Sequence, residues 1–99
     1  MPEVLDPSAV DAALAERGLP WDRRDGALER VVRLPDFARA LAFVNAVGRL
    51  AELADHHPDV DIRWGTVTLR LSTHSAGGIT SRDLDLASSI ERLTSGDGV

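Results

Sequence analysis

The sequence predicts an α+β domain in which three helices pack on one face of a four-stranded antiparallel sheet. Three segments carry apolar residues at helical spacing, and four short segments alternate apolar with polar residues. The short segments come in two consecutive pairs, each of which is typical of a hairpin. The predicted order is therefore α-β-β-α-β-β-α, and the 99 residues suit a single domain, 1–99.

The first predicted helix covers residues 7–17. Asp6 can cap its N-terminus, Pro7 suits the first helical position, and Gly18 favours the left-handed turn that ends a helix. One face of this segment is apolar, and it consists of Val10, Ala13 and Leu14.

The first predicted hairpin turns at Asp25 and Gly26, because these residue types accept the positive φ angles of a two-residue turn. The strands on either side cover residues 21–24 and 27–34. The second strand alternates imperfectly, since Arg30 shares a face with apolar residues. Those apolar residues are Leu28, Val32 and Leu34. The sequence therefore does not decide which face of this strand points toward the core.

The longest predicted helix begins at the pair Pro35-Asp36 and continues to about residue 54. A wide apolar face runs along it, as expected for a helix that packs on a sheet. The members of that face are Phe37, Ala40, Leu41, Val44, Val47, Gly48 and Ala51, with Phe43 and Leu50 beside them. Pro58 helps to end the helix, because the residue before a proline avoids the α region.

The second predicted hairpin has the clearest alternation in the chain. Its first strand places Val60, Ile62 and Trp64 on one face and Asp59, Asp61 and Arg63 on the other. After Gly65, its second strand places Val67, Leu69 and Leu71 opposite Thr66, Thr68, Arg70 and Ser72. Both patterns predict half-buried antiparallel strands.

The last predicted helix follows a loop at Gly77 and Gly78 and starts at Thr80. Asp83 lies three positions after Thr80, as in a capping box. The predicted buried stripe of this helix is Leu86, Ile90 and Leu93.

Composition excludes several classes of function. The sequence has no cysteine, so these residues form neither disulfides nor thiolate zinc sites. The net charge is −5 and the arginines are scattered among acids, which predicts no nucleic-acid partner. No apolar run approaches the roughly 20 residues that span a bilayer, and the N-terminus lacks the features of a signal peptide. We therefore expect a cytoplasmic protein without a membrane partner, with a disordered tail at 95–99.

Three histidines stand at the ends of predicted elements. His56 and His57 are adjacent where the long helix breaks, and His74 ends a strand. If these two exits meet at one edge of the sheet, rigid elements hold all three rings at an open site. Such a cluster can hold a proton donor and a proton acceptor at pH 7, because histidine titrates near neutrality. Exposed histidines without a function are the alternative interpretation.

Other polar and aromatic residues near the histidines also allow two interpretations. Glu52 lies one helical turn before His56 and could orient that ring, or it could make a solvated helix pair. Asp83 could serve the site or only cap its helix, and Trp64 could serve the site or pack on the sheet. We expect no metal site, because neighbouring helical residues point about 100° apart and no thiolate is available.

A series of fixed intervals runs through residues 52–83. A charged residue is followed after three residues by His-His-Pro, then after five by an aromatic residue, after nine by a histidine and after eight by an aspartate. The residues at these positions are Glu52, His56, His57, Pro58, Trp64, His74 and Asp83. With these intervals, the sequence resembles the pterin-4a-carbinolamine dehydratases. The LPW triplet at 19–21 and the spacing of Asp36, Phe37, Ala40 and Phe43 are similar too, so the resemblance covers about residues 8–94.

The resemblance implies the fold predicted above and a dehydratase that needs no metal and no bound cofactor. The implied reaction converts 4a-hydroxytetrahydropterin to quinonoid dihydropterin and water, in tetrahydropterin recycling. It implies that His56 and His74 are the acid/base pair and that His57 mainly holds the pterin. The remaining implied substrate-binding residues are Asp55, Pro58, Trp64, Ser72, Thr73, Ser75 and Asp83.

The resemblance also implies self-association as a homodimer or homotetramer. We expect the strands of the second hairpin or the last helix to make these contacts, because a chain this small has a limited core and its sheet edges need cover. The alternative function is that of a non-enzymatic oligomeric interaction module, since animal relatives also act as dimerisation partners of a transcription factor.

Overall fold

The computed structural model of the chain describes residues 3–94, so the predicted tail at 95–99 lies outside the described residues. The elements are α1 (Pro7–Arg17), β1 (Asp22–Arg24), β2 (Ala27–Arg33), α2 (Phe37–Ala54), β3 (Asp59–Arg63), β4 (Thr66–Leu71) and α3 (Ser81–Arg92). Their order confirms the predicted α-β-β-α-β-β-α arrangement. Within the described residues, no helix is both long and apolar enough to cross a bilayer.

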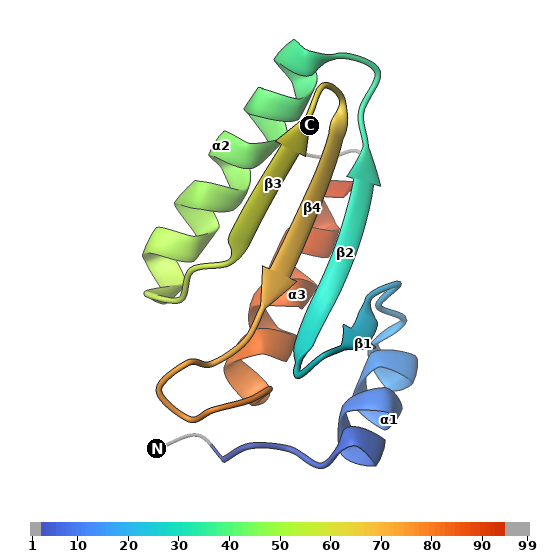
Figure 1. Cartoon of the computed structure of the whole chain (residues 1–99), viewed down its shortest axis with the longest axis vertical. Coiled ribbons are helices and arrows are strands. Elements are labelled where there is room, and N and C mark those ends of the chain that lie inside the picture. Colours follow the sequence, from blue (N-terminus) through green and yellow to red (C-terminus); the bar gives the residue numbers. More distant parts are fainter. Residues whose placement is uncertain (1–2, 95–99) are drawn as a thin grey trace.

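The sheet has the strand order β1-β2-β4-β3, and all neighbouring strands are antiparallel. The strand β4 therefore lies inside the sheet, while β1 and β3 form its edges. Figure 1 shows α2 and α3 behind the sheet, with α1 beside β1. The α+β prediction of one antiparallel sheet with three helices is confirmed.

The core lies between β2, β4 and the helices. All three apolar residues predicted to point inward from β4 are fully buried, which confirms the predicted alternation of that strand. The largest core side chains are Val10, Leu28, Phe43, Val47, Val67, Leu69, Leu71 and Ile90. This core fixes α2 and α3 against the same sheet, and so it sets the distance between the end of α2 and the start of α3.

Capping residues set most helix boundaries as the sequence predicts, but the Asp6 side chain makes no capping hydrogen bond at the start of α1. The Asp36 side chain accepts a hydrogen bond from the backbone N–H of Arg39 at the start of α2. Thr80 and Asp83 form the predicted capping box at the start of α3. Gly18 ends α1 in the left-handed conformation.

The predicted apolar face of α2 is partly wrong. Phe37 is 51% exposed and Leu41 is 40% exposed, whereas Phe43, which was expected only beside the face, is fully buried. The helix turns the side that contains Phe43, Val47 and Ala51 toward the core. Periodicity located an apolar sector, but tertiary packing decided which part of it faces the sheet.

The predicted inward row of β3 is also partly wrong. Val60 is 43% exposed, and Trp64 is 86% exposed and lies beyond the strand in the β3–β4 turn. Trp64 takes a left-handed backbone conformation there, with φ of +52°. A side chain on Gly65 would collide with the carbonyl oxygen of Leu34, so the turn approaches that segment closely and leaves Trp64 pointing away from the core.

Arg30 does share the inward face of β2, and an ion pair accommodates it. Its guanidinium makes two hydrogen bonds of 3.0 Å to the carboxylate of Glu91, near the end of α3. The indole N–H of Trp21 donates to the same carboxylate at 2.8 Å. The imperfect alternation therefore marks a half-buried polar cluster, because the partner of Arg30 comes from a distant helix.

Candidate functional site

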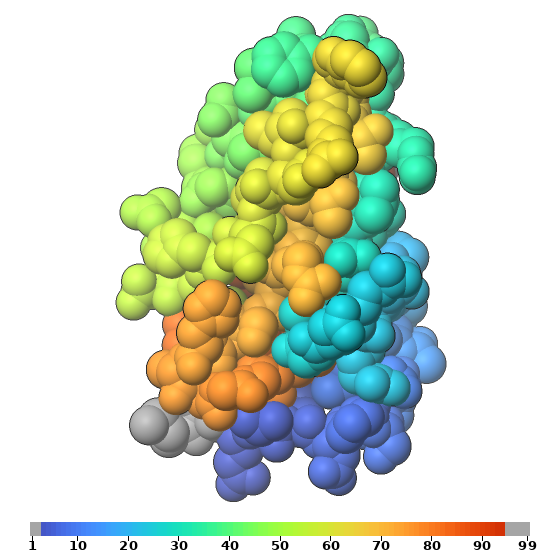
Figure 2. All heavy atoms as spheres, viewed as in Figure 1, coloured from blue at the N-terminus to red at the C-terminus, as the bar shows by residue number. Residues whose placement is uncertain are grey.

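The C-terminal ends of α2 and β4 lie near one another, next to the start of α3 (Figure 1). The loop after β4, coloured orange, lies directly beside the yellow-green end of α2 in the space-filling view (Figure 2). A hollow of about 250 Å³ lies between them. It is lined by Asp55, His56, His57, Ser72, Thr73, His74, Ser75 and Arg82. The structure thus brings the three histidines of the sequence pattern to one place.

A left-handed residue turns the chain out of α2 into this hollow. Asp55 has φ of +50°, and its backbone N–H bonds back to the last turn of the helix. The backbone N–H of His56 donates to the carbonyl oxygen of Ala51 at 3.0 Å, which closes the end of the helix. His56 therefore lies outside the helix, where the helical spacing of side chains no longer applies.

His56 is held by a buried carboxylate. Its Nε2 lies 2.5 Å from Oδ1 of Asp83, which is fully buried. The other carboxylate oxygen accepts hydrogen bonds from the Thr73 hydroxyl at 2.8 Å and the Thr80 backbone N–H at 2.9 Å. Asp83 therefore joins the capping box of α3 to the imidazole and fixes the orientation of that ring.

The remaining ring nitrogen of His56, Nδ1, is accessible from outside the described chain. It bonds none of the residues that the structure describes, and none of their buried polar side-chain atoms lacks a partner. Nδ1 is therefore accessible although the residue as a whole is only 8% exposed. This geometry gives a ring with one nitrogen fixed on a carboxylate and the other available for proton transfer.

Glu52 does not orient His56, so the first of the two interpretations that the sequence left open is wrong. Oε2 of Glu52 instead lies 2.5 Å from Nε2 of His57, and both side chains are exposed. The spacing of one helical turn brings two side chains together only within a helix, and the left-handed Asp55 ends α2 before residue 56. Glu52 can therefore orient His57 but not His56.

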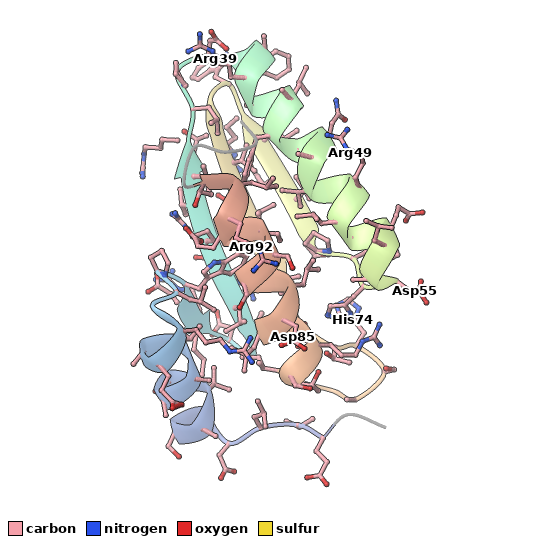
Figure 3. All side chains as sticks on the ribbon, turned by 180° about the vertical axis from the view of Figure 1, so that it is seen from behind. Arg39, Arg49, Asp55, His74, Asp85 and Arg92 are labelled. Atoms are coloured by element: carbon pink, nitrogen blue, oxygen red, sulfur yellow. The ribbon has the colours of Figure 1, made fainter. Side chains whose placement is uncertain are left out.

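His74 is the third residue after β4, at the start of the turn that follows Thr73, and is exposed. A turn closed by the carbonyl oxygen of Thr73, which accepts from the backbone N–H groups of Ala76 and Gly77, holds the loop. The His74 side chain makes no hydrogen bond with any residue in the range 3–94 and stays free to meet a ligand. Figure 3 shows His74 close to Asp55, while Arg39 lies at the other end of α2.

Three predicted site residues lie outside the lining of the hollow, and one of them is Asp83, which is fully buried and bonds to the lining residues His56 and Thr73. Pro58 is half-buried and follows His57 into β3. Trp64 lies in the β3–β4 turn, at the far end of β3 from the histidines (Figure 1). A strand rises roughly 3.3 Å per residue, so the five residues of β3 separate this indole from the hollow of the same chain.

One lining residue was missed in the sequence, namely Arg82. Its Nη2 donates to the carbonyl oxygen of Asp55 at 2.7 Å. A basic residue in the first turn of a helix is a weak signal, because it opposes the helix dipole without a local benefit. The side chains of residues 3–94 form no cluster of three or more His, Asp or Glu that could hold a metal ion.

The sequence matches the family described as pterin 4 alpha carbinolamine dehydratase over residues 3–93. The chain belongs to this family. A protein from Mycobacterium sp. (strain KMS) with the provisional name pterin-4-alpha-carbinolamine dehydratase is 52% identical over 90 residues, which cover 91% of this chain and 95% of the relative. A relative with the same provisional name from Acidobacterium capsulatum is 53% identical over 90 residues, with 90% and 96% covered.

Two solved structures share the fold of this chain. The crystal structure described as a transcriptional coactivator/pterin dehydratase from Brucella melitensis has a TM-score of 0.84 and 31% identity, and covers 92% of this chain and 98% of that one. A pterin dehydratase-like protein described as a RuBisCO assembly factor in the alpha-carboxysome has a TM-score of 0.61 and 18% identity, covering 76% and 87%. The second likeness supports the fold alone.

Proposed function

We propose that this chain dehydrates 4a-hydroxytetrahydropterin to quinonoid dihydropterin by histidine acid/base catalysis. The observation that carries the proposal is the single hollow that contains His56, His57 and His74. Family membership supports the same reaction class. The reaction would return oxidised tetrahydropterin to a form that can be reduced and used again.

The reaction requires one proton to leave and one to arrive. The N5–H bond of the substrate breaks, its electron pair forms the C4a=N5 double bond, and the C4a–O bond breaks as the hydroxyl takes a proton and departs as water. Two positioned imidazoles in opposite protonation states can perform both transfers, each worth roughly 10²–10⁴-fold in rate. No oxidant or reductant enters this balance.

His56 is assigned as the proton donor and His74 as the acceptor. The buried carboxylate of Asp83 supports positive charge on the His56 ring, as the orienting acid of a catalytic triad does. His74 has no carboxylate bonded to it among the described residues and is exposed. In this assignment Asp83, and not Glu52, supplies the carboxylate beside His56.

The other residues of the hollow would hold the pterin ring. His57, fixed by Glu52, is assigned to binding, and the side chains or backbone groups at Asp55, Ser72, Thr73 and Ser75 complete the lining. Asp83 would act through His56, since it is fully buried. Pro58 would contribute by restricting the backbone of the adjacent His57 to an extended conformation.

Self-association is part of the proposal. β3 is an edge strand, and exposed apolar residues lie on it, in the turn after it and on α2. The most exposed among them are Phe37, Leu41, Leu53, Val60 and Trp64. Surfaces of this kind favour contact with another chain. A substrate-binding role for Trp64 requires a second copy to carry it to the hollow.

The assay that tests the function is the disappearance of a freshly generated 4a-carbinolamine. We expect His56→Ala and His74→Ala to lower turnover by ~10²-fold or more while the fold persists. The rate of the parent protein should be bell-shaped in pH, because the working pair is lost at both extremes. Full activity in both variants would refute the assignment, and a parent protein that binds other chains but dehydrates no pterin would favour the non-enzymatic interaction module.

Light scattering tests the assembly. We expect a mass that is a multiple of the 10.7 kDa chain, and Val60→Lys should shift it toward a single chain by placing a charge on the edge strand. A single-chain mass for the parent protein at micromolar concentration would contradict self-association.

A further inference from the structure

Arg82 differs from the other half-buried arginines of the described chain. Arg30 pairs with Glu91 at 3.0 Å, and Arg70 pairs with Glu29 at 2.8 Å. Arg82 is equally half-buried, but no carboxylate of residues 3–94 forms an ion pair with it. Its guanidinium makes a single hydrogen bond to the described chain, to the carbonyl oxygen of Asp55.

The fold itself gives no reason for a positive charge at this position. Arg82 is the second residue of α3, where a cation opposes the helix dipole at a cost of roughly 0.3–1 kcal/mol. The helix is already capped by Thr80 and Asp83. Asp85, the acid three residues further along the helix, pairs with Arg17 instead, at 3.0 Å.

The unused donors of Arg82 are available to a ligand in the hollow. A guanidinium carries five N–H donors and no acceptor, and only one donor here is bound to Asp55. The side chain lines the same hollow as the three histidines. None of the described buried side-chain polar atoms lacks a partner, so these donors are solvated rather than trapped.

We propose that Arg82 binds the oxo oxygen at C4 of the pterin ring, an inference that rests on the proposed function. The guanidinium stays protonated throughout, so it can bind only an acceptor and cannot exchange the protons of the reaction. The C4 oxygen is the carbonyl acceptor of the ring and is bonded next to C4a, the carbon that loses its hydroxyl. Holding this oxygen at α3 directs C4a and N5 toward His56 and His74.

The proposal makes Arg82 a specificity residue for 4-oxo over 4-amino pteridines. A 4-amino group presents donors where Arg82 also presents donors, so the two would repel rather than bind. If Arg82 only held the carbonyl oxygen of Asp55, it would not contact the ligand and would produce no such preference. The preference therefore separates substrate binding from a structural role.

The test is calorimetric binding of two unreactive ligands, 6-methylpterin and 2,4-diamino-6-methylpteridine, which differ in the group at C4. We expect the parent protein to bind the 4-oxo ligand more tightly than the diamino ligand. Arg82→Gln should lower the affinity for the 4-oxo ligand by about tenfold or more and change the affinity for the diamino ligand by no more than about twofold. Arg82→Lys, which keeps the charge and a donor, should give an intermediate loss and serves if the glutamine variant does not fold. Arg39→Gln removes the same charge at the far end of α2 and should change neither affinity (Figure 3).

Two results would overturn the inference. If Arg82→Gln lowers the affinity for both ligands equally, Arg82 acts only by holding Asp55. If the variant binds the 4-oxo ligand as tightly as the parent protein does, Arg82 does not contact the ring. In either case the parent protein still binds pterin, and the proposed function stands. If the parent protein binds neither ligand and dehydrates no carbinolamine, the proposed function fails together with this inference.

Discussion

Two replacements of Asp83 should separate its effect on stability from its effect on catalysis. Its carboxylate is fully buried and bonds three groups, the His56 ring, the Thr73 hydroxyl and the Thr80 backbone N–H. Asp83→Ala leaves all three without that partner, and breaking a buried charged contact of this kind costs about 3–5 kcal/mol. We therefore expect that loss in the free energy of unfolding, measured by urea denaturation.

Asp83→Asn should preserve more of the fold and still impair the reaction. An asparagine oxygen can keep the hydrogen bonds from Thr73 and Thr80, but its amide then presents a donor to Nε2 of His56. The ring would carry its proton on Nδ1 instead, without a negative charge beside it. We expect a loss of turnover of about 10²-fold or more in the carbinolamine assay, with a smaller loss of stability than in the alanine variant.

Asp85→Asn is the matched control on the same helix. Asp85 is exposed and pairs only with the half-exposed Arg17, so its loss should change stability by less than about 1 kcal/mol and leave turnover intact. The reasoning is refuted if Asp83→Ala is no less stable than this control. It is also refuted if folded Asp83→Asn turns over at the parent rate.

Three further predictions concern pH, a glycine and metals. Burial, the largest single influence, acts to raise the pKa of Glu91, but hydrogen bonds from Arg30, Thr94 and Trp21 together lower its pKa below 4.5. Because the pKa of Glu91 is lower in the folded state, the stabilisation is present above the pKa of the unfolded state and is lost as pH falls through the pKa of the folded state. Glu91→Gln should therefore flatten the acid dependence of the unfolding free energy below roughly pH 5, and an unchanged slope would contradict this role of Glu91. Gly65→Ala should lower the free energy of unfolding, measured in urea, by about 1–3 kcal/mol, because the new methyl group meets the Leu34 carbonyl oxygen. Gly48→Ala, in the open middle of α2, should be neutral or stabilising, and the reverse order would count against the close approach at the turn. Dialysis against a chelator should leave dehydration unchanged, and activity lost on dialysis and restored by zinc would overturn the metal-free mechanism.

The sequence by itself determined the order of elements and the positions where they begin and end. The caps at Asp36 and Thr80 and the turn at Asp25-Gly26 each depend on a few neighbouring residues, and all are present in the structure. Strong alternation likewise located the buried row of β4. These signals are local, so the chain carries them whatever its tertiary packing.

The sequence also singled out the three histidines. They stand at the ends of predicted elements, which the same local signals locate, and they match the fixed intervals of residues 52–83. The helix exit at His56 and His57 and the strand exit at His74 meet at one hollow once the sheet is antiparallel. The roles of these residues remain predictions that the variants above test.

Only the tertiary structure decided which groups pair across the fold. Asp83 rather than Glu52 holds His56, Glu91 accommodates Arg30, and Trp64 ends in an exposed turn rather than on the sheet. The left-handed backbone at Asp55 breaks the helical spacing, and α3 approaches from a segment distant in the sequence. Such contacts depend on the relative placement of whole elements, which a core of long-range packing sets and which no local pattern in the chain encodes.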